Sequence, residues 1–195
     1  AYGWHVPPRN TPEWYAFGVL DRVLLQGEDS RLWQRLVKEK GYTDGVAGGI
    51  NLLGNMFNYE GPMLWSAYLI HDANVPEAAI TAEIDDVIAR VQREPLPPGE
   101  LERALTKMRS GLYDVAGSPT RFGLVDLLAS FALFDDDPAR INRIDDELRK
   151  VTPELVMKTA QEYLRPTNRT VLTVQAGRAS AGEAKSPAAP SGGPR

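Results

Sequence analysis

The stretch that decides the fold covers residues 20–49 and reads LDRVLLQGEDSRLWQRLVKEKGYTDGVAGG. Its apolar residues first follow helical spacing as far as Gly27, and Ser30 then stands where a second helix needs its N-cap. Gly41 ends that helix, because glycine readily adopts the left-handed conformation that follows a helix C-terminus. A glycine-rich strand comes next, with a bulge or a close packing contact predicted at residues 48–49. This segment therefore predicts two helices followed by a strand.

Outside this stretch, strand patterns come first and a block of helices follows. Strands are predicted over 2–6, 43–53 and 170–176, and residues 56–70 are predicted to form one or two strands with a break near residues 61–62. Helices are predicted over 11–26, 30–40, 74–94, 97–116, 122–131, 141–148 and 152–165. Both faces of the 56–70 segment are mostly apolar, which predicts a central strand covered by helices. This order favours an α+β fold with a largely antiparallel sheet and helices packed on one face.

Composition excludes several classes of function. The chain of 195 residues has no cysteine, so it forms no disulfide, thiolate zinc site or cysteine nucleophile. Its formal net charge is −4 and its basic residues are dispersed, so no nucleic-acid footprint is visible. No run of about 18 apolar residues is present to span a membrane. The apolar fraction, 43%, is that of an ordinary globular protein.

Two features predict how the chain is organised. Residues 1–177 form one domain, and residues 178–195 lack large apolar side chains, so we expect a disordered tail there. The sequence opens inside a strand pattern, in which Tyr2 and Trp4 alternate with smaller or polar residues. We therefore expect a piece of a longer polypeptide.

Metal chemistry finds little support in the residues. A catalytic zinc needs three protein ligands and one open position. The only histidines are His5 and His71, which are far apart in the sequence and belong to no zinc-binding motif. We expect no catalytic residue and no metal ligand in this chain.

Several segments, taken in order, resemble one peptidase family. They are SRLWQRL at 30–36, PGELERA at 98–104, VTPELV at 151–156 and the strand pattern after residue 168. Their order and spacing resemble the C-terminal, inactive domain of the insulinase/pitrilysin-type zinc peptidases, the inverted zincins that include mitochondrial processing peptidase. The resemblance covers about residues 1–176. Within the family, the chain is similar to bacterial subunits of the processing-peptidase type.

The resemblance implies a parent subunit with two similar domains. In this family the first domain carries His-x-x-Glu-His, whose histidines bind zinc and whose glutamate acts as the base. Zinc would then lie in the parent or a partner subunit and not in this chain. The implied partners are the missing N-terminal domain, a homologous subunit in a homo- or heterodimer, and peptide substrate. Bacterial relatives suggest a periplasmic or cell-envelope location.

The family's second domain often supplies an arginine and a tyrosine that hold the substrate near the scissile carbonyl, where a cationic or phenolic donor stabilises negative charge. The resemblance places Val37 at the arginine position and Asp44 at the tyrosine position, so both groups are lost. Arg35 and Tyr42 have a similar mutual spacing and are candidates for substrate contact. The alternative is an exposed pair with no role in binding.

Arg31 is the third candidate for substrate contact. The alternative for this residue is packing at the helix start with an ion pair to Asp21 or Glu28.

Three functions stay open. The first is a non-catalytic domain that forms part of a clamp around peptide substrates. The second is a subunit of a pseudo-peptidase that acts as a scaffold or in assembly. The third is a free-standing α+β binding module. A His-x-x-Glu-His motif upstream in the parent would favour the first.

Overall fold

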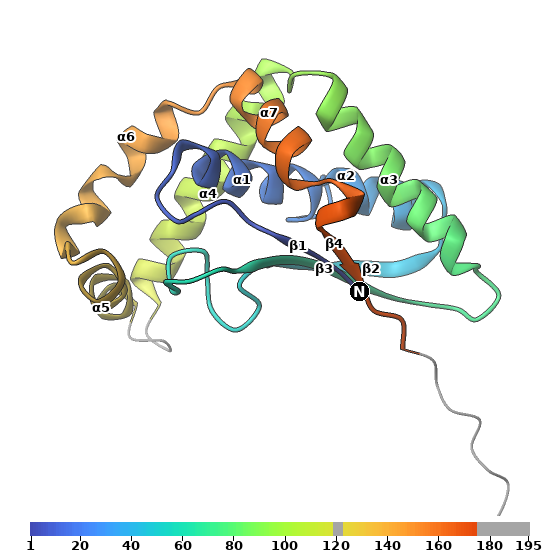
Figure 1. Cartoon of the computed structure of the whole chain (residues 1–195), viewed down its shortest axis with the longest axis horizontal. Helices are drawn as coiled ribbons and strands as arrows, with labels where there is room; N and C mark the ends of the chain where they lie inside the picture. The colour runs from blue at the N-terminus through green and yellow to red at the C-terminus, as the bar shows by residue number, and fades with distance from the viewer. Residues whose placement is uncertain (119–122, 175–195) are drawn as a thin grey trace, which may run out of the picture.

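One antiparallel sheet carries the fold, and helices cover only one of its faces (Figure 1). The computed structural model describes residues 1–118 and 123–174. Within these residues the sheet has the order β2-β3-β1-β4, and every neighbouring pair is antiparallel. The strands are β1 (Tyr2–His5), β2 (Thr43–Ile50), β3 (Leu64–His71) and β4 (Arg169–Val171). The predicted α+β class is confirmed, whereas the predicted tail at 178–195 lies outside the described residues.

The helices follow the predicted order along the chain. They are α1 (Pro12–Leu24), α2 (Arg31–Trp33), α3 (Glu77–Arg93), α4 (Pro98–Gly117), α5 (Leu124–Asp135), α6 (Ile144–Arg149) and α7 (Pro153–Tyr163). A π-helix, Gln34–Glu39, continues α2, and 3-10 turns cover Pro138–Arg143 and Pro166–Asn168. Two helix starts are fixed by side-chain caps, because the hydroxyls of Thr11 and Thr152 accept hydrogen bonds from main-chain N–H groups one turn on.

Helix α1 forms the centre of the core. Ten of its 13 residues are buried, and it contacts both α4 and α7. Phe17 packs edge-on against Trp65 of β3, with ring centroids 6.0 Å apart, and Trp65 in turn lies 5.2 Å from Trp4 of β1. Such aromatic contacts add to the burial of apolar area that holds the helix on the sheet.

Strand β3 is an interior strand, as predicted, but only one of its faces is covered. Trp65 and Ala67 are buried beneath the helices. Leu64, Tyr68 and Ile70 point to the other face and are 42%, 45% and 88% exposed. The prediction that helices cover this strand is therefore wrong for one face, because every helix of the described chain lies on the opposite side (Figure 1).

One prediction for α5 is wrong in detail. The helical spacing predicts that Val125, Leu128 and Phe131 pack inward; Phe131 is buried as predicted, but Val125 is 66% exposed and Leu127 is buried in its place. Phe122, predicted on the same face, lies outside the described residues. The irregular pairing of β2 with β3 falls between Thr43 and Val46, so a bulge at residues 48–49, one of the two alternatives predicted there, is not observed. Among the described residues, no helix is long and apolar enough to cross a membrane.

Candidate functional site

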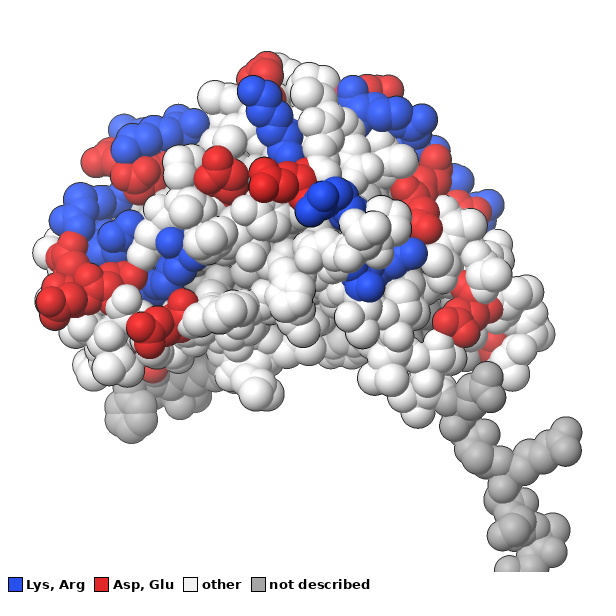
Figure 2. Space-filling model, in the orientation of Figure 1, with Lys and Arg blue, Asp and Glu red and all other residues white. Residues whose placement is uncertain are grey.

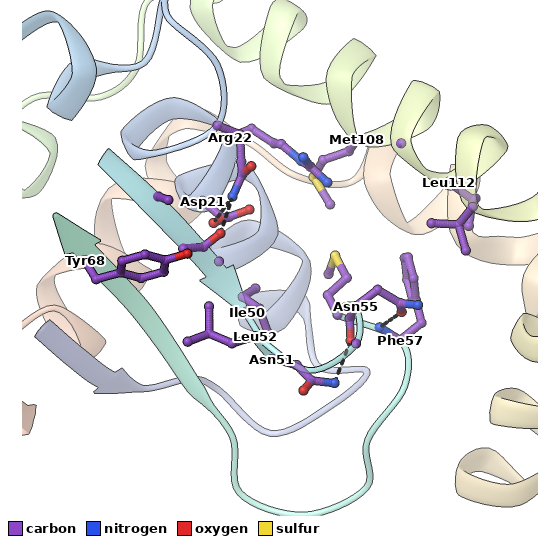
Figure 3. A pocket seen from close by; sticks show the side chains of 18 residues that line it. Asp21, Arg22, Ile50, Asn51, Leu52, Asn55, Phe57, Tyr68, Met108 and Leu112 are labelled. Carbon is purple, nitrogen blue, oxygen red and sulfur yellow. Dashed lines mark hydrogen bonds between the residues drawn. The ribbon is translucent and has the colours of Figure 1, made fainter. Parts of the chain in front are cut away.

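A cavity of about 390 Å³ opens beside β2 and is large enough for a small ligand or a short peptide segment (Figure 3). Among the described residues β2 is the last strand of the sheet, and no strand of this part of the chain pairs with its outer side. The cavity walls come from α1, α4 and the loop after β2. We call this cavity the β2 groove; residues that line it include Arg22, Gln26, Gly48, Leu52, Met108 and Gly111.

Two glycines make the strand wall of the β2 groove. Gly48 and Gly49 have φ angles of 144° and 143°, which side chains rarely tolerate. A Cβ on Gly48 would lie 1.9 Å from the main-chain oxygen of Ser66 on β3, whereas a Cβ on Gly49 would lie 3.2 Å from the side chain of Gln26. The predicted close packing contact is confirmed at Gly48, and main chain rather than side chain faces the groove here.

The Gly48 carbonyl points away from the sheet. Gln26 donates a hydrogen bond from Nε2 to this oxygen at 3.1 Å and another to Asp21 Oδ1 at 3.1 Å (Figure 3). A side-chain amide thus occupies an acceptor that a neighbouring strand would otherwise use. The outer edge of β2 therefore has a main-chain acceptor available to a ligand that replaces Gln26.

Asp21 lies beneath the groove and is only 7% exposed. Trp65 donates from Nε1 to its Oδ1 at 2.7 Å, beside the bond from Gln26. Burial raises the pKa of Asp21 above its ordinary value, and the opposing effects of the Arg22 charge and of these hydrogen bonds do not cancel the shift. Asp21 therefore anchors Gln26 and Trp65 by accepting their hydrogen bonds.

Arg22 is the cation of the β2 groove. Its side chain is half-buried and extends from α1 toward α4, near Met108 (Figure 3). A Cβ at Gly111 of α4 would lie 3.2 Å from Arg22 Nη2, so the glycine leaves room for the guanidinium. Within residues 1–118 and 123–174, Arg22 has neither an ion-pair partner nor a hydrogen-bond acceptor. Its donors are therefore available to a ligand.

The loop after β2 forms the rim of the groove. Asn51 adopts a left-handed conformation with φ 56°. Its Nδ2 donates to the main-chain oxygens of Asn55 at 3.1 Å and Asn58 at 3.0 Å, which fixes the loop against itself. Leu52 and Leu53 project from this rim and are 56% and 97% exposed, but only Leu52 lines the cavity.

The three predicted candidates for substrate contact lie outside the β2 groove. Arg31 forms a two-pronged ion pair with Glu100 of α4, at 2.9 and 2.6 Å, and not with Asp21 or Glu28 as predicted. Helix α4 returns to this part of the fold, which brings Glu100 beside Arg31.

Arg35 lies in the π-helix and is tied to three acidic residues, of which Asp86 is the most distant, with its Oδ2 3.7 Å from Arg35 Nη2. Its Nη1 is 2.7 Å from Glu39 of the same turn, and its Nε is 2.5 Å from Glu83 of α3. Tyr42 is half-buried against the core, and its main-chain N–H donates to the Leu36 carbonyl. Both side chains thus belong to contacts around the π-helix.

The two positions that the resemblance assigns to the family's arginine and tyrosine hold Val37 and Asp44 in this chain. Val37 is half-buried and packs against the core, and Asp44 is exposed near the start of β2. Neither side chain offers the cationic or phenolic donor that would stabilise negative charge on a carbonyl oxygen.

The histidines are placed too far apart to share a metal ion. His5 pairs with Leu64 at one end of β3, and His71 ends that strand seven residues further on. At the rise of a β-strand, this separation is roughly 24 Å. In the part of the chain that the structure describes, no three His, Cys, Asp or Glu side chains form a group that could hold a metal. These residues do not fit a catalytic zinc.

Sequence reasoning missed Arg22 and Gln26 as site residues. One signal was present, since Asp21 and Arg22 are adjacent charged residues in the otherwise apolar stretch from Trp14 to Leu24. It was not sufficient, because α4 contributes the opposite wall of the groove.

The fold and the groove define a single helix-over-sheet domain without a zinc-ligand set among its described residues. The family model described as the peptidase M16 inactive domain matches residues 1–108, and the chain belongs to this family. The resemblance to the inactive domain of insulinase/pitrilysin-type peptidases is thereby confirmed. A comparison with curated protein sequences gives no match.

Solved structures show the same fold. The inactive peptidase domain of a candidate zinc protease from Bordetella parapertussis superimposes with a TM-score of 0.70 at 20% identity, covering 87% of each chain. A protease from Helicobacter pylori gives 0.69 at 16% identity, covering 86% of this chain and 38% of its own. The peptidase M16 inactive domain from Pseudomonas fluorescens gives 0.68 at 18%, with 86% and 38% covered. This chain thus spans about two fifths of the two longer proteins, and identities this low show the fold alone.

Proposed function

We propose that this chain is the non-catalytic C-terminal domain of a zinc-peptidase subunit and forms one wall of a clamp around peptide substrates. The observation that carries the proposal is the unpaired edge of β2, which faces an open groove with bare glycine main chain. Extended peptides commonly bind by adding a strand to such an edge, because main-chain hydrogen bonds supply affinity for many sequences.

The peptide would lie between β2 and α4. One of its N–H groups replaces the Gln26 amide on the Gly48 carbonyl. Side chains on a strand alternate between its two faces, so alternate peptide residues point toward α1 and α4. Apolar side chains of the rim and of α4, including Leu52 and Leu112, supply contacts that do not depend on sequence.

The open face of the sheet supports a second contact, with the rest of the parent protein. Leu64, Tyr68 and Ile70 form an exposed apolar row on β3. Figure 2 shows charged side chains of both signs over the helices, while the lower part of this view, toward the sheet, is mostly uncharged. Apolar surface exposed in this way marks an interaction site. We propose that the parent's N-terminal domain or a homologous subunit covers this face.

In this proposal the zinc ion is not bound by this chain. We place it in the N-terminal domain of the parent or in a partner subunit, since the histidines of this chain do not fit a metal site. We assign Arg31 and Arg35 to the ion pairs that join α2 and the π-helix to α4 and α3, rather than to peptide contact. Tyr42 is assigned to packing.

Amide chemical shifts test the peptide contact. The 15N-labelled 195-residue chain is titrated with an acetylated and amidated nonapeptide of Ser, Thr, Val and Ala. We expect shift changes at residues 47–52 and none at the other sheet edge, Arg169–Val171. Changes confined to β4, or no saturable change at all, would overturn the proposed groove.

A matched pair of variants refines this test. Leu52→Ser removes an apolar contact of the groove, worth about 1 kcal/mol or about fivefold in affinity. Leu53→Ser makes the same chemical change one residue on, outside the groove, and is expected to leave affinity unchanged. Mass spectrometry of the peptide, with and without added Zn²⁺, is expected to find it intact. Metal-dependent cleavage would refute the non-catalytic role.

The scaffold alternative is supported by the residue types at the two positions that the resemblance assigns to substrate binding, since Val37 and Asp44 bring no side-chain donor there. It predicts that peptides leave the β2 groove unperturbed while the domain still associates with a homologous subunit through the open sheet face. Shift changes at Leu64 to Ile70 on addition of such a subunit, without any peptide response, would support it.

A further inference from the structure

We propose that Arg22 gives the β2 groove a preference for peptide segments that carry an Asp or Glu side chain. This inference rests on the proposed function, because it names the substrate class of the same groove.

The arginines near α1 and α2 differ in whether a carboxylate of this chain pairs with them. Arg9 is paired with Asp135 and Arg31 with Glu100, whereas Arg35 contacts Glu39 and Glu83. Arg22, at the end of α1, has no carboxylate partner among the described residues although it is half-buried. The charge of Arg22 acts on the neighbouring Asp21 carboxylate without an ion-pair contact. A partly desolvated guanidinium whose donors bond to no carboxylate gains more from a ligand carboxylate than a fully hydrated one does.

Asp21 does not fill this role. Neighbouring residues on a helix point about 100° apart, and the Asp21 carboxylate turns inward to Trp65 and Gln26. Arg22 instead extends toward Met108 and α4, above the cavity (Figure 3). The guanidinium is therefore the charged group that a bound peptide would meet.

Gly111 leaves room for the Arg22 guanidinium against α4, because a Cβ there would lie 3.2 Å from Nη2. The space for a carboxylate is the open cavity of about 390 Å³ that Arg22 lines. A guanidinium presents parallel N–H donors that match the two oxygens of a carboxylate, so one Asp or Glu can bind with both. Peptide residues that point away from the sheet edge, toward α1 and α4, come from alternate positions of the added strand.

The groove geometry favours a side chain over a peptide C-terminus. The cavity lining continues along β2 from Ala47 to Ile50 and onto the following loop as far as Phe57. A peptide that lies along this length passes Arg22 and does not end there. We therefore commit to an internal acidic residue as the group that Arg22 binds.

Fluorescence anisotropy with three labelled nonapeptides tests the inference on the 195-residue chain. The first peptide, acetylated and amidated, has Glu at its centre among Ser, Thr, Val and Ala. The second has Gln instead, and the third is the Gln peptide with a free C-terminal carboxylate. We expect the Glu peptide to bind about tenfold more tightly than both others, as charge-assisted hydrogen bonds do. Added NaCl should shrink this ratio.

Two variants locate the effect. Arg22→Gln is expected to bind the Glu and Gln peptides equally. Arg165→Gln is the matched control, because Arg165 is exposed, lies outside the groove and loses the same charge; it should keep the tenfold preference.

The outcomes separate the two proposals. Equal binding of the Glu and Gln peptides by the unaltered chain would overturn the role of Arg22 and leave the peptide groove standing. A preference that persists in Arg22→Gln, or a free C-terminus that binds as tightly as Glu, would also overturn it. Absence of binding by all three peptides would overturn both proposals. The comparison of the three peptides uses the unaltered chain. It therefore tests the role of Arg22 even where Arg22→Gln folds poorly.

Discussion

Alanine at Gly48 should damage this domain far more than alanine at Gly49. Both glycines share the same unusual φ, which costs a residue with a side chain about 1–3 kcal/mol. At Gly48 the new Cβ would also lie 1.9 Å from the Ser66 oxygen, against an ordinary C···O contact of about 3.3 Å. To relieve this contact, β2 must move more than an ångström away from β3. Each β2–β3 hydrogen bond that is lost in the move costs about 1 kcal/mol.

The expected cost of Gly48→Ala is therefore about 3–5 kcal/mol, a large fraction of the stability of an ordinary domain. Gly49→Ala should cost only about 1–3 kcal/mol, because its Cβ meets the movable end of the Gln26 side chain. Gly61→Ala is the control, since nothing lies within 4 Å of that position. Urea unfolding followed by tryptophan fluorescence measures all three, with m-values checked for constancy. Equal costs at 48 and 49, or a cost below about 1 kcal/mol at Gly48, would refute the steric argument.

Two carboxylates yield further predictions for the free energy of unfolding. Asp135→Ala should lower it by about 3–5 kcal/mol, because it leaves buried Arg9 without its partner. Burial alone would raise the Asp135 pKa, but the hydrogen bonds and charge of Arg9 outweigh it and lower the pKa below 3.8. The stability that the Arg9–Asp135 pair contributes should therefore be present above pH 3.8 and be lost as pH falls through the folded pKa, which urea midpoints measured against pH would show. Asp21→Asn should be neutral or stabilising at pH 7, because Asn keeps an acceptor oxygen for Trp65 and the charged form of Asp21 is disfavoured by burial. The advantage of this variant should grow as pH rises from 4 through the raised folded pKa, and an advantage that shrinks with rising pH would contradict the reasoning.

Periodicity and capping residues were enough to predict most elements. Thr11 followed by Pro12 predicted a capped helix start, and the structure shows that cap. The open face of β3 was not predictable in the same way. Leu64, Tyr68 and Ile70 read as apolar whether a helix of this chain or another domain covers them, since periodicity reports which side is apolar and not what lies against it.

The site was harder to predict than the fold, because its residues come from separate elements. The Gly48–Gly49 pair carried a usable signal, since consecutive glycines in a strand indicate a close approach of main chain. The partner of Arg31 was expected nearby in the sequence, but Glu100 of α4 binds it instead. Arg22 belongs to the groove only because α4 packs beside α1 and places Gly111 next to it. Long-range packing of this kind leaves no local pattern in a single sequence.

The two ends of β2 differ in a way that bears on the role of the domain. Asp44, near the start of the strand, offers no donor to a carbonyl oxygen, whereas Gly48 and Arg22 at the other end offer an acceptor and a cation. Four residues of strand separate the two positions, which is about 13 Å. Stabilising a reacting oxygen requires a donor within about 3 Å of it, and the Asp44 side chain has none to offer. A peptide bound at the Gly48 end would therefore be held in place by this wall, and its activation would have to come from another domain.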